Sequence, residues 1–74
     1  MQQGDIDQLL KRDPCPLLRL HLAGGQVFEI SDSDQAVLGL STVEILLPRE
    51  DGRYREAVIN LWQIAWIEVV SPTT

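Results

Sequence analysis

The chain has 74 residues but only one cysteine, Cys15, and one histidine, His21. A lone cysteine forms no internal disulfide, and one Cys with one His does not supply the usual ligand set of a structural zinc site. The sequence therefore predicts no metal and no cofactor. Because a domain of this length buries only about 60% of its surface, it is marginally stable on its own. Partner subunits are the remaining way to stabilise it.

Positive charge is also scarce. Six Lys and Arg stand against 11 Asp and Glu, which gives a formal net charge of −5. That balance has the wrong sign for a protein that binds nucleic acid through bulk electrostatics. Lys11 and Arg12 are an exception, because in a ring the copies of this pair would gather on one face and bind phosphates weakly. RNA therefore stays open as a partner, although the charge does not favour it.

No hydrophobic run reaches the length of a membrane span, which needs about 18 apolar residues. The longest candidate, residues 57–70, is interrupted by Asn60, Gln63 and Glu68. The first five residues have neither the basic nor the apolar region of a signal peptide. From these features and the free thiol we expect a cytoplasmic protein with no membrane contact.

No arrangement of side chains points to catalysis. His21 lies on the polar side of a predicted strand, and Ser41 and Cys15 have no general base at a recognisable spacing. The carboxylates of Asp32 and Asp34 belong to a Ser/Asp cluster that is typical of a solvated turn. We therefore expect no catalytic residues and no enzyme.

Hydrophobic spacing predicts a short helix followed by strands. Ile6, Leu9 and Leu10 form one apolar stripe, so we expect a helix at about residues 5–12, ended by the prolines that follow. From Leu17 onward, apolar and polar residues alternate as in half-buried strands, and the paired glycines at 24 and 25 suit a hairpin turn. The predicted strands cover about 17–23, 26–31, 36–47 (bent or bulged near Gly39), 54–61 and 64–70.

Residues 57–70 are apolar without keeping to one face. Trp62 and Trp66 are four residues apart, as on a buried helix, but the many β-branched residues favour strands. Strands that are apolar on both faces need cover on both, and one short helix does not provide it. We therefore expect Trp66 to be buried and part of the cover to come from outside the chain.

Three segments carry a resemblance to a known family. Residues 18–28, LRLHLAGGQVF, look like a strand, a glycine turn and a second strand; residues 34–38, DQAVL, are similar to the segment that opens the third strand of Hfq. Residues 58–67, VINLWQIAWI, look like the motif in which a short turn joins the last two strands. In order and spacing, the chain resembles the Sm-like (LSm/Hfq) superfamily over roughly residues 6–69.

The resemblance implies one mainly β domain over residues 1–74. It would have a short N-terminal helix followed by five strongly bent antiparallel strands in a small Sm-like or SH3-like barrel. In this family, strand four of one subunit pairs with strand five of the next to close a ring, and such pairing would supply the missing cover. The interface would then include Val58, Ile59, Ile64 and Trp66.

The family's RNA-binding positions are only partly matched. Leu38 stands near the position of the uridine-binding Asn, and residues 59–61 replace the Tyr-Lys-His pore residues of Hfq without a cation or an imidazole. We therefore expect a homo-oligomeric ring that acts as an assembly or protein-interaction module. The alternatives are an RNA-binding riboregulatory ring and a monomeric SH3-like barrel that pairs its free edges with a larger partner. The candidate RNA-binding residues are Asp34, Gln35, Asn60, Lys11 and Arg12.

Overall fold

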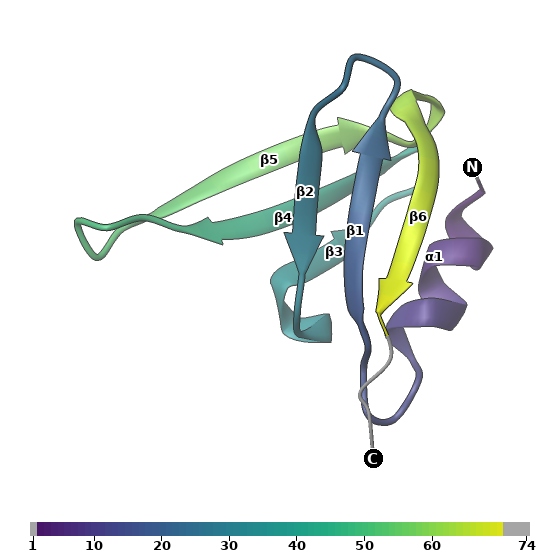
Figure 1. The fold of residues 1–74 in the computed structure, drawn as a ribbon, viewed down its shortest axis with the longest axis horizontal. Coiled ribbons are helices and arrows are strands. Elements are labelled where there is room, and N and C mark those ends of the chain that lie inside the picture. The colour runs from purple at the N-terminus through teal and green to yellow at the C-terminus, as the bar shows by residue number, and fades with distance from the viewer. Residues whose placement is uncertain (1, 71–74) are drawn as a thin grey trace.

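A computed structural model describes residues 2–70 of the chain (Figure 1). The element order confirms a mainly β chain with one short N-terminal helix. None of the helices within residues 2–70 has the length and apolar character needed to cross a membrane. The elements are α1 (Gln3–Leu10), β1 (Leu17–Leu22), β2 (Val27–Ile30), β3 (Ala36–Leu38), β4 (Thr42–Pro48), β5 (Tyr54–Asn60) and β6 (Ile64–Val70).

The strands form two three-stranded antiparallel sheets. Sheet A has the order β2-β1-β6, and sheet B has the order β3-β4-β5. Gly25 has a φ of 97° in the turn between β1 and β2, and Gly52 has a φ of 83° between β4 and β5. Glycine suits both turns because positive φ is costly for other residues. The β4–β5 hairpin extends beyond the rest of the molecule as a long arm (Figure 1).

The core lies between the two sheets, and α1 packs against it. On β1, Leu18 and Leu20 are fully buried, so the predicted alternation is confirmed. The helix contributes Ile6 and Leu10, which confirms its predicted apolar stripe. Two short 3₁₀ helices, at residues 33–35 and 61–63, connect strands of different sheets. The buried hydrophobic residues are Ile6, Leu10, Leu18, Leu20, Ile30, Val43, Ile45, Ile59, Leu61 and Ile64.

The predicted single strand at 36–47 is wrong. Residues 36–38 and 42–48 form two strands, β3 and β4, which pair with each other in antiparallel fashion. The chain reverses at Gly39, whose N–H donates to the carbonyl oxygen of Thr42 at 2.8 Å. The prediction failed because both strands are apolar and Gly39 reads equally well as a bulge or as a turn.

Two further expectations need correction. The helix covers residues 3–10 instead of 5–12, so Lys11 is its C-cap and Arg12 lies beyond it. It begins early because the Asp5 carboxylate accepts from the Gln2 N–H at 3.2 Å. The predicted five-stranded barrel is also not found: residues 2–70 form six strands in two sheets and no closed barrel.

Candidate functional site: the free edges of β5 and β6

Two long strands, β5 and β6, each have one edge that no strand within residues 2–70 covers. In sheet B, β5 pairs only with β4, and in sheet A, β6 pairs only with β1. Each of the two strands is seven residues long, whereas the other edge strands, β2 and β3, have four and three residues. A long open edge presents unpaired backbone N–H and C=O groups that favour pairing with another strand.

The four predicted interface residues are divided between the surface and the core. Val58 is 61% exposed and Trp66 is 53% exposed. By contrast, Ile59 and Ile64 are each only 5% exposed and pack in the core of their own chain. The side chains of Val58 and Trp66 are thus free to contact a partner, while Ile59 and Ile64 offer only their backbone groups.

A 3₁₀ helix at Leu61–Gln63 joins the two strands across the core. The Asn60 side chain accepts from the Trp62 N–H at 3.0 Å, and the Leu61 N–H donates to the carbonyl oxygen of Ser41 at 2.9 Å. The Leu61 side chain is buried, so this connection is held by packing in the core as well as by the two hydrogen bonds. It fixes where β5 ends in sheet B and where β6 begins in sheet A.

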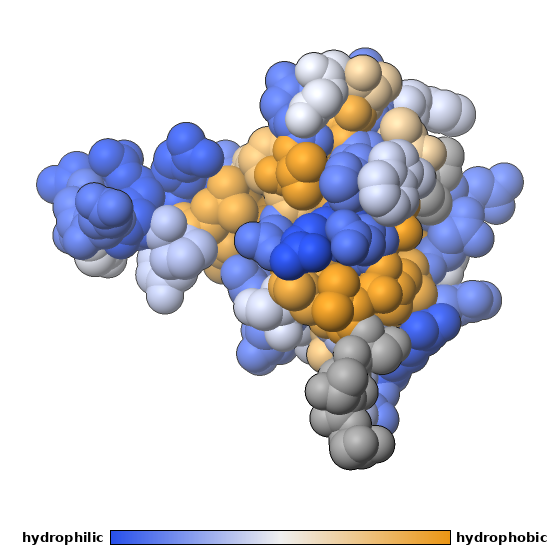
Figure 2. Space-filling model, viewed as in Figure 1, coloured by the Kyte–Doolittle hydropathy of each residue, from blue (hydrophilic) through white to orange (hydrophobic). Residues whose placement is uncertain are grey.

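The outer face of sheet A carries a row of charged side chains across all three strands. Arg19 on β1 pairs with Glu29 on β2 at 3.0 Å and with Glu68 on β6 at 3.3 Å. The hydrogen bond to Glu29, together with the charge of Glu68, raises the pKa of Arg19 above its ordinary value. Figure 2 shows a hydrophilic band on this face with hydrophobic surface on either side. The row ends at β6, next to the open edge.

The outer face of sheet B places two carboxyl groups side by side. Glu44 on β4 lies opposite Val58 on β5, and Glu56 is two residues along β5 on the same face. The hydrogen bond and the charge of Glu56 raise the pKa of Glu44. No ion pair joins either carboxylate to a cation within the part of the chain that the structure describes. This pair was not anticipated, because it depends on the register between β4 and β5.

Two of the polar residues predicted to bind RNA, Gln35 and Asn60, bond to the chain's own backbone. The Gln35 side-chain oxygen accepts from the Ser31 and Asp32 N–H groups at 2.9 and 3.0 Å, and its NH₂ group donates to the Leu46 carbonyl at 3.3 Å. Asn60 caps the 3₁₀ helix at residues 61–63 and pairs with Thr42 at the start of β4, whereas Leu46 lies near the other end of that strand. Asp34 is exposed beside Gln35. The three residues therefore do not converge on one pocket within the chain.

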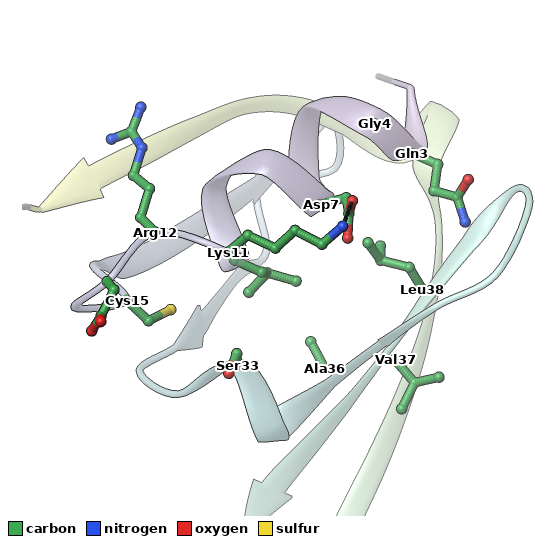
Figure 3. A pocket seen from close by; sticks show the side chains of 12 residues that line it. Gln3, Gly4, Asp7, Lys11, Arg12, Cys15, Ser33, Ala36, Val37 and Leu38 are labelled. Atoms are coloured by element: carbon green, nitrogen blue, oxygen red, sulfur yellow. Dashed lines mark ion pairs between the residues drawn. The ribbon is translucent and has the colours of Figure 1, made fainter.

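Lys11 and Arg12 border an open groove of about 820 Å³ between α1 and β3 (Figure 3). The Lys11 ammonium pairs with Asp7 at 2.8 Å, while Arg12 extends away from the groove (Figure 3). No group of three or more metal-ligating side chains occurs between residues 2 and 70.

Comparison with known proteins does not place the chain in a family. No protein-family model, curated protein or solved structure matches it. The candidate site therefore rests on the geometry of β5 and β6 and on the side chains beside them.

Proposed function

We propose that this chain is a subunit of an Sm-like homo-oligomeric ring that acts as an assembly or protein-interaction module. In this proposal the free edge of β5 pairs with the free edge of β6 in the next copy. The observation that carries it is the pair of equally long open edges, each with an exposed apolar side chain, Val58 or Trp66, next to its central residue. Pairing would remove the open edges and would cover Val58 and Trp66.

The path of the chain supports the Sm-like part of the proposal. β2 lies in sheet A and the next strand, β3, lies in sheet B. Together they take the place of one strongly bent strand that would be shared by both sheets. In this proposal β4, β5 and β6 correspond to strands three, four and five of the Sm-like order, and residues 36–38 end strand two instead of opening strand three, where the resemblance put them.

Matching the two strands residue by residue gives a definite register. Even-numbered side chains point outward along β5 and, from Trp66 onward, along β6, since Val58 and Glu56 lie on the outer face of β5 and Trp66 and Glu68 on that of β6. A register shift at Ala65 turns Ile64 toward the core. Full antiparallel overlap puts Tyr54 opposite Val70, and therefore Val58 opposite Trp66. An aromatic side chain opposite a β-branched one stabilises a strand pair by about 0.2–1 kcal/mol.

The RNA-binding alternative has less support. The amide groups of Gln35 and Asn60 already bond to the chain's own backbone, and each subunit has a formal net charge of −5. A ring multiplies that charge, which repels the phosphates of RNA.

The register can be tested by disulfide crosslinking in a Cys15→Ser background. In the full overlap, Glu56 lies opposite Glu68 of the next subunit, so the double variant Glu56→Cys/Glu68→Cys should give a ladder of linked subunits after mild oxidation. The matched control is Glu44→Cys/Glu68→Cys, because β4 is one strand further from the joint and its Cα lies beyond the roughly 7 Å limit for a disulfide. No ladder, or an equal ladder from the control, would contradict the proposed pairing.

A further inference from the structure

The outer faces of the two sheets differ in whether their carboxyl groups form ion pairs with a cation. On sheet A, Arg19 forms ion pairs with both Glu29 and Glu68. On sheet B, the neighbouring Glu44 and Glu56 form no ion pair with any cation in residues 2–70. A pair of like charges on adjacent strands opposes the sheet that carries it.

The next step rests on the proposed function, because it uses the joint between β5 and β6. The register described above puts Glu56 of one subunit directly opposite Glu68 of its neighbour. Glu44 lies diagonally beside Glu56, one strand further from the joint. Each joint therefore gathers three carboxyl groups near one guanidinium, Arg19, which already contacts two glutamates in its own chain.

We infer that proton uptake by this three-carboxyl cluster regulates the assembly, which tightens in mildly acidic solution and loosens near neutral pH. On sheet B, Glu44 and Glu56 share the outer face with the phenol of Tyr54, while β3 presents the uncharged Val37 there. On sheet A, the facing groups are Arg19, His21, Glu29 and Glu68.

The direction of the pH effect follows from the linkage between proton binding and assembly. Glu56 already raises the pKa of Glu44 within one chain, and the approach of Glu68 from a neighbour adds a further negative charge. The assembled state therefore binds more protons than the free subunits, so the association constant rises as pH falls. Each unit by which a carboxyl pKa rises on assembly strengthens a joint by up to about tenfold at low pH.

The test measures the concentration of half-dissociation at pH 7.5 and at pH 5.5, which is above the sequence pI of about 4.5. Analytical ultracentrifugation of the wild-type chain should give a value at least about threefold lower at pH 5.5. Glu56→Gln should assemble more tightly than wild type at pH 7.5 and should lose most of the pH dependence. Glu50→Gln, which makes the same charge change in the exposed turn, should behave as wild type.

The outcomes separate this inference from the proposed ring. An assembly whose half-dissociation concentration is the same at both pH values would overturn the inference and leave the ring standing. A pH dependence that survives undiminished in Glu56→Gln would also overturn it, because that variant lacks the carboxyl group that lies between Glu44 and the neighbour's Glu68. A chain that stays monomeric under all conditions would overturn both proposals.

Discussion

The imidazole of His21 and the indole of Trp66 stack in parallel, with ring centroids 3.8 Å apart and an angle of 7° between their planes. His21 is on β1 and Trp66 is its register partner on β6, so the stack ties the two strands together on the outer face of sheet A. The expectation that Trp66 is buried is therefore wrong for the single chain. Its exposed half faces away from the core, beside the free edge of β6.

Trp66→Ala should lower the free energy of unfolding by roughly 2 kcal/mol. It removes the stack with His21 and the contacts of an indole of which about half is buried. Trp62 is 75% exposed, and Trp62→Ala should cost only about 0.5 kcal/mol. Urea denaturation of both variants at one low protein concentration measures the difference. Equal losses in the two variants would contradict the stacking role.

Gln35→Ala should lower the free energy of unfolding by about 1–2 kcal/mol, since its side chain bonds to Ser31, Asp32 and the Leu46 carbonyl. Asp34→Ala is the control, because within residues 2–70 the Asp34 carboxylate makes no hydrogen bond or ion pair. Chemical denaturation should show a clear loss for the first variant and little change for the second. The reverse order would mean that Gln35 does not hold this turn in place.

Glu44→Gln should raise the melting temperature at pH 7 and leave it nearly unchanged at pH 4. The pKa of Glu44 is raised in the folded chain by Glu56, so folding is favoured when the group is protonated and loses that advantage as pH rises through the raised pKa. Calorimetry at both pH values measures the effect, with Glu50→Gln as a variant of equal charge. A gain at pH 4 as large as that at pH 7 would be inconsistent with carboxylate repulsion.

RNA should bind weakly. We expect no dissociation constant tighter than roughly micromolar for labelled oligo-U or oligo-A at physiological salt, the range of sequence-independent association. Fluorescence anisotropy measures it directly. Nanomolar binding that is lost in Asn60→Ala, with the fold intact, would restore the RNA-binding alternative in place of the assembly module.

Local patterns predicted much of the fold. The alternation of Leu18 and Leu20 and the paired glycines at 24 and 25 identified β1, β2 and their turn. The Ser/Asp cluster interrupts the strands as predicted, and within it Asp32 caps the 3₁₀ helix at residues 33–35, with its carboxylate accepting from the Asp34 N–H at 3.0 Å. These features depend on neighbours in the sequence, which is why the residue types alone reveal them.

Features that depend on pairing between distant strands were not predictable. The Glu44–Glu56 contact follows from the register of β4 with β5, and the His21–Trp66 stack from that of β1 with β6. Trp66 was misplaced because residues 57–70 are apolar on both faces, so alternation does not show which face meets the core. The four residues proposed for an interface were predicted as one group, and the separation of buried Ile59 and Ile64 from exposed Val58 and Trp66 needed the structure.

The most direct test of the proposed edge pairing is the mass of the native particle at micromolar concentration. One subunit has a mass of 8.3 kDa, and light scattering or native mass spectrometry should give a single whole-number multiple of that mass, as expected for a closed ring. Val58→Lys puts a charge on the outer face of β5 beside the joint and should shift the mass toward one subunit, whereas Val37→Lys, on β3, should not. A wild-type mass near 8.3 kDa would contradict the account.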